Sequence, residues 1–510
     1  MKKLLAILLA AAMVALCACG ATKTEPETQA APAESGQVTE AADATASTPE
    51  LDPGYTMPDT DPGMTEGNEA LSALTKPLVI MHTNDAHCGV DKNWGYASLY
   101  AMKQYFLKSN HVALIDAGDH TQGEPIGTMT SGSSVIKIMN TIGYDLAIPG
   151  NHEFDYGMDK FNENVAAAEF PYLSCNFTHE GEQVLKSYII KEYDGVKIAF
   201  VGICTPETLT STNPKSLKDE NGNYIYGFSE DKTGEKLYNT VQAAVDAARA
   251  EGAAFVVGVS HLGDEEAVAP YTYADVLANT SGIDVLCDGH SHDTNIVTMK
   301  NKEGKPVIRT STGTKLLNVG VVTFSPDGTI KAENYQWNQK AAAPELLQLE
   351  NAAAQAVNNE LEVLNKELSV VVGKTSFDMV INDPEKTMED GSPIRIVRNN
   401  ETNLGDFLSD AYLNAAGGEA DAAILNGGGI RDKIPAGDIT LNTLLKVFPF
   451  QNELSVMELS GQAILDALEW GVHGQPSEFG GFLHVSNITF TVDLTVESPA
   501  ISDDSSTLVG

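Results

Sequence analysis

The sequence predicts a layered α/β fold within a chain of more than one domain, and three observations predict it. With 510 residues, the chain is too long for one domain and should hold two or three folded units. Its 42% hydrophobic residues supply enough apolar side chains for real cores. From Pro77 onward, short apolar runs that read as buried strands alternate with amphipathic segments such as 238–250. This alternation is typical of layered α/β domains.

The charge balance excludes two classes of partner. The chain has 32 basic and 70 acidic residues, which give a net charge of −38. Such a surface repels phosphate backbones, so the composition excludes a broad basic face for nucleic acid polymers and electrostatic docking on anionic lipid. An anionic small molecule would therefore need a local positive centre.

The first residues predict an export signal over 1–18. Two lysines precede an apolar run, Leu4 to Ala18, that is too short for the ~20 residues of a bilayer span. The sequence from Leu16 to Gly20 resembles a bacterial lipobox. This resemblance implies cleavage before Cys19, acylation of its thiol, and a protein anchored to the outer face of the cell membrane. The alternative is an ordinary signal peptide with incidental cysteines.

Residues 19–75 read as an acidic, disordered stalk. They are rich in Ala, Thr, Glu, Pro and Gly, and show no hydrophobic period. Most of the negative charge nevertheless lies beyond Lys76, in the folded body. Four further cysteines lie far apart in or beside apolar runs, so we expect unpaired, buried thiols. These are Cys88, Cys175, Cys204 and Cys287.

Seven apolar runs read as buried strands of the first domain. They are 78–81, 112–115, 146–148, 197–201, 254–259, 283–286 and 318–322. Five of them are followed by side chains with oxygen or imidazole ligand atoms. In chain order these are Asp85 and His87, then Asp119, then Asn151, then His261, then His290 and His292. Loops beyond strand carboxyl ends converge at one edge of such a domain. Asp, Asn and His gathered there suit a pair of divalent ions, with one carboxylate able to bridge them.

The motifs that carry these residues resemble those of a known family. Asp-x-His, Gly-Asp-x-x-x-Gly, Gly-Asn-His-Glu, a single downstream His and Gly-His-x-His occur in the order found in calcineurin-like metallophosphoesterases. Their longer forms at 150–155 and 289–293 resemble the bacterial 5′-nucleotidase branch. The resemblance covers roughly residues 77–494. It implies an α/β/β/α sandwich over 76–337, followed by a smaller α/β substrate-recognition domain.

The resemblance also implies a role for each ligand. Asp85, His87 and His292 would hold one metal ion. Asn151, His261 and His290 would hold the other, and Asp119 would bridge the two. Mixed His, Asp and Asn ligation is compatible with zinc, manganese or cobalt.

Two further residues beside the ligands are implied to be catalytic. His152 would donate to the phosphoryl oxygen and Asp155 would orient its ring. The other histidines do not match the ligand pattern, and we expect them to be structural. They are His82, His111, His120, His179, His473 and His484.

A long helix is expected within the linker region 338–369. From Glu345 to Leu368, apolar residues recur at helical spacing. The resemblance implies a pivot between two domains, and a packed connector is the alternative.

Residues 370–510 carry the markers of the second domain. Glycines near 427–429 allow a close approach to a ligand, and three of the five arginines lie between 395 and 431. The resemblance implies that Arg398, Asn426 and Arg431 contact the sugar and phosphate region. It also implies that Phe450 stacks on the base and that Asn452 hydrogen-bonds nearby.

The chain departs from the family pattern in two places. Many relatives have Arg where this chain has Asn400. A last strand is expected at 488–492, followed by a polar tail, whereas the family continues with a Gly-rich segment that bears a second base-stacking aromatic residue. We therefore expect either an incomplete second domain or a base clamp with one aromatic face only.

Together these features predict an exported enzyme that hydrolyses nucleoside 5′-monophosphates with a metal-bound hydroxide, for nucleotide scavenging. Two alternatives within enzymes are a 2′,3′-cyclic-nucleotide phosphodiesterase with 3′-nucleotidase activity and a UDP-sugar hydrolase. The resemblance favours the 5′-nucleotidase over the cyclic phosphodiesterase, because related cyclic phosphodiesterases often carry Asn where this chain has Asp155. An alternative from another class is a non-catalytic nucleotide-binding lipoprotein.

Overall fold

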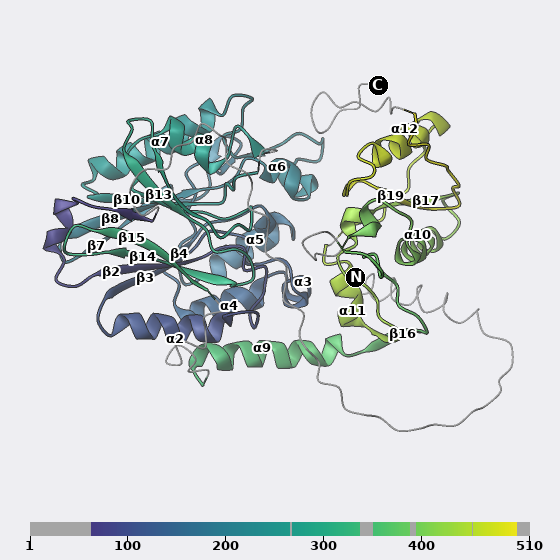
Figure 1. The fold of residues 1–510 in the computed structure, drawn as a ribbon, viewed down its shortest axis with the longest axis horizontal. Helices are drawn as coiled ribbons and strands as arrows, with labels where there is room; N and C mark the ends of the chain where they lie inside the picture. The colour runs from purple at the N-terminus through teal and green to yellow at the C-terminus, as the bar shows by residue number, and fades with distance from the viewer. Residues whose placement is uncertain (1–62, 266–267, 337–349, 388–393, 451, 497–510) are drawn as a thin grey trace. The chain divides into compact units, whose positions relative to one another are not determined.

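The computed structural model describes residues 63–265, 268–336, 350–387, 394–450 and 452–496. The chain forms two compact units that divide between Leu364 and Asn365 (Figure 1). None of the helices in the described ranges combines the length and apolar character that a bilayer crossing requires. The predicted signal peptide, Cys19 and the stalk up to residue 62 lie outside the described residues.

The first unit is a sandwich of two six-stranded sheets with helices on both outer sides (Figure 1). Helices α2 and α4 lie on one side, and α7 and α8 lie on the other. The first sheet contains, in order, β1 (Met64–Thr65), β15 (Ile330–Gln336), β14 (Asn318–Phe324), β2 (Leu78–Thr83), β3 (His111–Asp116) and β4 (Leu146–Ala147). The second contains β12 (Ile296–Lys300), β13 (Pro306–Thr310), β11 (Val285–Cys287), β10 (Phe255–Ser260), β8 (Val196–Ile203) and β7 (Tyr188–Tyr193). This architecture confirms the predicted layered fold.

Alternation along the strands builds the two main cores. In β8, Ile198 and Phe200 belong to the core between the sheets, whereas Ala199 and Val201 pack with α7 (Glu235–Ala250). Successive side chains of a strand point to opposite faces, so a fully apolar strand fills both layers. This is why the strands of the first unit read as continuous apolar runs.

The parallel strands bring their carboxyl ends to a common edge. In the first sheet, β2, β3 and β4 are parallel neighbours, and in the second, β8, β10, β11 and β13 are. The residues that follow these strands are the ones predicted to bind metal. The fold therefore places them at one end of the sandwich.

Residues 63–75 belong to this unit, which corrects the predicted stalk boundary. Strand β1 pairs with β15, and Leu71, in a short 3-10 helix (Glu69–Ala73), is fully buried. Leu71 and Leu74 join the core between the sheets. The sequence did not predict this segment as folded, because it is mostly polar and its two core leucines, Leu71 and Leu74, are too few to produce a recognisable hydrophobic period.

The remaining helices and short strands of the first unit complete the sandwich. The helices are α2 (Gly95–Leu107), α3 (Pro125–Thr130), α4 (Ser133–Ile142), α5 (Met158–Ala167), α6 (Thr208–Ser211) and α8 (Tyr273–Asn279). A small sheet contains β6 (Glu182–Gln183), β5 (Thr178–His179) and β9 (Tyr226–Gly227). The four cysteines are buried and free, as predicted.

The predicted linker helix is α9 (Ala352–Leu368). Residues 337–349 lie outside the described residues. The Asn351 side chain donates to the Ala97 carbonyl at 2.8 Å, and Glu360 accepts from the Ser134 hydroxyl and pairs with Lys137 at 3.3 Å. Up to residue 364, the helix is therefore packed on the first unit.

Beyond the end of α9, the described residues of the second unit form two small antiparallel sheets, three α-helices and two short 3-10 helices, Ile396–Arg398 and Gly427–Gly429. The strand pairs are β16 (Val371–Thr375) with β18 (Gly437–Thr440), and β17 (Ala423–Asn426) with β19 (Leu483–Ser486). The helices are α10 (Asn403–Ala415), α11 (Leu441–Val447) and α12 (Gly461–Val472).

The strand predicted at 488–492 is wrong, because the strand lies earlier. Residues 483–486 pair with β17, the Ser486 hydroxyl donates to Asp410, and Asn487 then leaves the sheet with a φ of 58°. Residues 488–492 form no strand. The β-branched and aromatic residues of 488–492 favour a strand, but none of the described strands pairs with this segment.

Candidate metal centre

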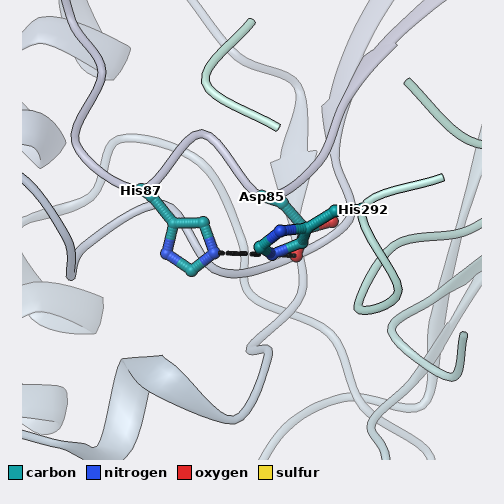
Figure 2. Close-up of side chains that lie close together, drawn as sticks. All are labelled: Asp85, His87 and His292. Carbon is teal, nitrogen blue, oxygen red and sulfur yellow. Dashed lines mark hydrogen bonds and ion pairs between the residues drawn. The ribbon is translucent and has the colours of Figure 1, made fainter. Parts of the chain in front are cut away.

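Strand-end loops from both sheets meet in a cluster of ligand side chains at the edge described above. Among the residues that the structure describes, two groups of three have ligand atoms close enough to hold an ion. One consists of Asp85, His87 and His292, which Figure 2 shows, and the other of Asp85, Asp119 and His261.

The first group converges on one point. Nε2 of His87 and Nε2 of His292 are 3.0 Å apart, and Oδ1 of Asp85 lies 3.9 Å and 3.5 Å from them (Figure 2). Ligands of one zinc-like ion, each about 2.0–2.2 Å from it, are roughly 3–3.5 Å apart. This group therefore has the spacing of a metal-ligand set, as predicted.

The second group shares carboxylates with the first. Nε2 of His261 is 3.1 Å from Oδ2 of Asp119 and 3.8 Å from Oδ1 of Asp85. The same Asp119 oxygen is 3.8 Å from Nε2 of His87. Asp119 thus lies between the two groups, where a bridging ligand is expected, and Asp85 also reaches both.

Two buried atoms test whether the residues fit metal ions. Oδ1 of Asn151 is buried without a hydrogen-bond partner, and Nε2 of His261 is buried with only the Asp119 carboxylate near it, at 3.1 Å. A buried polar atom left unpaired costs about 1–3 kcal/mol. Both atoms can donate a lone pair when the His261 ring is neutral, and coordination of a divalent cation would satisfy each of them. The residues therefore fit a two-metal centre.

Hydrogen bonds fix which ring nitrogen is available in two of the histidines. Nδ1 of His87 donates to the Gln122 carbonyl at 3.1 Å, and Nδ1 of His261 donates to the Ala117 carbonyl at 2.7 Å. A carbonyl only accepts, so each neutral ring keeps its lone pair on Nε2, the atom that faces the cluster.

The electrostatics of the cluster favour cations. Burial lowers the pKa of His87 to about 4, which keeps that ring neutral. Burial also lowers the pKa of His261, but the carboxylates of Asp119 and Asp85 outweigh it and raise the pKa to about 10. The two buried carboxylates therefore attract positive charge to this point.

His290, predicted to bind the second metal ion, lies at the border of the cluster. Its Nε2 lies 2.5 Å from Oε2 of Glu207, and the residue belongs to neither ligand group. Its ring is 5.0 Å from that of His261, so it borders the cluster. Glu207 carries no motif. The available signal was its position shortly after β8, another strand that ends at this edge.

His152 and Asp155 form the predicted pair beside the ligands. Nδ1 of His152 is 2.7 Å from Oδ2 of Asp155, whose other oxygen accepts from the Thr212 hydroxyl at 2.7 Å. The His152 side chain is 23% exposed, and its ring lies 5.4 Å from that of His87. Burial lowers the pKa of His152, but the charges of Asp119 and Asp155 outweigh it and raise the pKa to about 9.

The ligand loops have strained backbones. Five of the predicted ligands are in the left-handed region at φ values from 42° to 84°, and they are Asp85, His87, Asp119, His290 and His292. Such conformations persist only where the surroundings enforce them, and they cluster at functional sites.

Glu153 enforces part of this geometry, a role that sequence reasoning missed. Its buried carboxylate accepts backbone N–H groups of Asp119, His120 and Gly150 at 2.7–2.9 Å. It therefore ties the loop after β3 to the loop after β4. Its place inside the Gly-Asn-His-Glu motif was the only signal.

The six histidines expected to be structural lie outside both ligand groups. His120 is buried and pairs with Asp116 at 2.8 Å and with the Tyr172 hydroxyl at 2.6 Å. The others contact Thr310 (His82), Asp194 (His111), Tyr226 (His179), Trp470 (His473) and the Val397 carbonyl (His484).

In the second unit, four of the five predicted substrate-binding residues gather around the glycines at 427–429. The Asn426 side chain donates to the Gly480 carbonyl at 3.1 Å, and Arg431 donates to the Gly428 carbonyl at 3.3 Å. The Arg431 guanidinium is 5.7 Å from the Phe450 ring centre. Burial, then the nearby charges of Arg395 and Arg431, lower the pKa of Arg398. Asn452 is exposed.

Two family models match the chain. The model of the calcineurin-like phosphoesterase matches residues 78–294, and that of the 5′-nucleotidase C-terminal domain matches 372–502. The first match contains every predicted metal ligand, and the second contains every predicted substrate-binding residue.

Individual proteins agree with these models. The chain is 30% identical over 457 residues to a trifunctional nucleotide phosphoesterase of Bacillus subtilis, covering 82% of this chain but only 29% of that protein. It is 27% identical to a 5′-nucleotidase of Vibrio cholerae, covering 82% and 79% of the two chains. Among solved structures, a 5′-nucleotidase precursor from Thermus thermophilus has a TM-score of 0.61 and 26% identity, covering 83% of each chain.

The order of the two matched domains, the metal-ligand geometry and these relatives agree: the chain has a calcineurin-like phosphoesterase domain ahead of a 5′-nucleotidase C-terminal domain and is similar to bacterial 5′-nucleotidases.

Proposed function

We propose that this protein hydrolyses nucleoside 5′-monophosphates to nucleoside and phosphate, with two divalent ions of zinc, manganese or cobalt. One observation carries the proposal: the side chains of Asp85, His87 and His292 and those of Asp85, Asp119 and His261 form two adjoining groups with metal-ligand spacing. The two matched domains and the similarity to 5′-nucleotidases support hydrolysis of a nucleotide phosphoester.

The metal ions and the residues that hold them would have distinct roles in the reaction. Bound divalent ions would polarise a phosphoryl oxygen and lower the pKa of a water molecule near neutral pH. Asp85, His87, His292, Asp119, Asn151 and His261 would hold them, with His290 at the border. Because Asp85 and Asp119 bring negative charge to the site, cations are also needed before a phosphate can approach.

His152 acts on the substrate rather than on a metal. Its Nδ1 is occupied by Asp155, so the protonated ring presents Nε2–H as a donor. A donor fixed beside the ligand cluster stabilises negative charge as it develops on the phosphoryl oxygen. Asp155, held by Thr212, sets the ring orientation and stabilises its positive charge.

The second unit would recognise the nucleotide. Arg398 and Arg431 supply planar donor forks for sugar and phosphate oxygens, Asn426 supplies an amide beside them, and Phe450 supplies an aromatic face for the base. Asn452 would hydrogen-bond near the base.

A phosphate-release panel tests this proposal. Purified protein is assayed on AMP, UDP-glucose, a 2′,3′-cyclic nucleotide and an artificial diester. We expect the highest kcat/KM on AMP. A higher value on the cyclic nucleotide or on UDP-glucose would assign the chain to one of the alternative activities, and no activity on any of them would favour a nucleotide-binding protein.

Two histidine variants locate the activity. His152→Ala should lower kcat on AMP by about 10²- to 10⁴-fold, the usual contribution of a positioned proton donor. His111→Ala is the matched control, since it removes a histidine that pairs with Asp194 at 2.8 Å on the same unit, away from the ligands. Equal activity of the two variants would contradict the role of His152.

We also propose that the enzyme is exported, anchored through a lipid on Cys19 and used for extracellular nucleotide scavenging. The apolar run before Cys19 and the small residues around it support this. In a bacterial host, Cys19→Ala should abolish incorporation of labelled palmitate and release the protein from the membrane fraction. Unchanged labelling and fractionation would contradict the anchor.

A further inference from the structure

Arg309 is a fully buried cation that the proposed chemistry does not use. It lies on β13, with 0% of its side chain exposed. The guanidinium binds Asp288 through Nη2 at 2.9 Å and Nε at 3.2 Å, and binds Asp293 through Nη1 at 2.6 Å and Nη2 at 2.8 Å. The Tyr273 ring covers it at 4.2 Å.

The two carboxylates stand on either side of the loop that carries His290 and His292. Asp288 immediately follows β11, and Asp293 immediately follows His292. One guanidinium therefore fixes both ends of this loop. Its two histidines have strained backbones, with φ values of 84° and 56°, so the loop needs such restraint.

Asp288 extends the restraint to a second ligand loop. Its other oxygen accepts from the Ser260 hydroxyl at 2.7 Å and from the Leu262 backbone N–H at 2.9 Å. These two residues flank His261. Arg309, through Asp288, thus connects β13 to the ends of β10 and β11.

We infer that Arg309 is a positioning residue that holds the His261 and His290–His292 loops in metal-binding geometry. The inference rests on the proposed function, because it concerns the same site. Arg309 touches neither ligand atoms nor substrate, and acts through Asp288 and Asp293. Its removal would leave the buried Asp288 carboxylate and the partly buried Asp293 carboxylate without their common partner, and the two would repel each other.

The chain contains a matched control at the opposite end of the same strands. Arg249 binds Asp284 at 2.6 Å and the carbonyls of Ala253 and Gly282. Asp284 directly precedes β11, whereas Asp288 directly follows it. Loss of Arg249 should therefore destabilise the same region without reaching the ligand loops.

The test measures Mn²⁺ affinity by equilibrium dialysis, together with thermal unfolding and the kcat and KM for AMP. The variants are Arg309→Met, Arg309→Lys, Asp293→Asn and Arg249→Met in the full chain. Arg309→Met should weaken Mn²⁺ binding by about 10- to 100-fold, as expected for residues that orient metal-binding histidines. Lysine cannot reproduce the planar set of donors of a guanidinium, so Arg309→Lys should restore only part of the Mn²⁺ affinity that Arg309→Met loses. Arg249→Met should lower the unfolding temperature and leave Mn²⁺ affinity unchanged.

Asp293→Asn keeps the size of the side chain and should also weaken Mn²⁺ binding, which covers the case that Arg309→Met does not fold. If Arg309→Lys and Asp293→Asn bind Mn²⁺ as tightly as the unmodified protein, the inference is wrong although the proposed function stands. An unmodified protein that neither binds Mn²⁺ nor hydrolyses AMP would overturn both.

Discussion

Nδ1 of His152 donates to Oδ2 of Asp155 at 2.7 Å, and this bond turns the ring so that its other nitrogen is available beside the ligand cluster. The bond lies within a turn whose backbone is also fixed, since the His152 N–H donates to Oδ1 of Asp119 at 2.9 Å. The carboxylate of Asp119, which lies between the two ligand groups, thus also holds the backbone of His152, the proton donor.

Asp155→Asn should therefore lower kcat without removing the metals. The amide keeps the shape of the side chain but loses the charge that stabilises protonated His152. We expect a fall of about 10- to 100-fold, smaller than for His152→Ala. Steady-state kinetics on AMP and metal analysis check this together, and a variant with lost metal and unchanged kcat per bound metal would contradict the assigned role.

Glu153→Gln should destabilise the folded protein. The buried carboxylate accepts several N–H groups, and the amide NH₂ of glutamine would face donors where an acceptor is needed. We expect the free energy of unfolding to fall by roughly 2–4 kcal/mol. Urea unfolding measures it. Glu163→Gln, at an exposed glutamate, should change it by less than about 0.5 kcal/mol, and equal effects of the two substitutions would disprove the prediction.

Gly150→Ala should abolish metal binding. A Cβ at this position would lie 2.3 Å from Oδ1 of Asp119 and 2.8 Å from Nε2 of His261, so the two ligands would have to separate. Metal content after dialysis against Mn²⁺ tests the effect. Gly461→Ala, where a Cβ would meet nothing within 4 Å, should leave it unchanged. Full metal content in Gly150→Ala would show that the loops adjust.

Phe450→Ala should raise the KM for AMP and leave kcat nearly unchanged. Stacking of a base on an aromatic ring contributes about 1–3 kcal/mol, so we expect an increase of roughly 5- to 150-fold. Phe377→Ala is the control, because that ring is 57% exposed on the same unit and has no proposed role in nucleotide binding. If both variants keep the original KM, Phe450 does not stack on the base.

The sequence predicted the ligand cluster because the information is local. Each ligand directly follows an apolar strand, and parallel strands must bring their ends together. The strands of the first unit are buried on both faces, so their runs are unbroken and easy to recognise. His87, His292, Asp119 and His261 consequently lie where the pattern placed them.

What the sequence did not predict depends on distant contacts. Arg309 lies on β13, after the His290–His292 loop and strand β12, and belongs to no recognisable motif. It lies between Asp288 and Asp293 only because the strands pack together. Glu207 meets His290 across 83 residues. The segment with Leu71 is held by strand β15, far along the chain. Such residues become visible only when the sheets are assembled.

The count of divalent ions per chain, taken together with AMP hydrolysis, tests the two-metal account most directly. The protein is stripped with a chelator, titrated with Mn²⁺ and assayed for phosphate release at each step. We predict no activity in chelator and full recovery as the content reaches about two ions per chain. Full activity in chelator, or recovery complete at one ion per chain, would contradict the account.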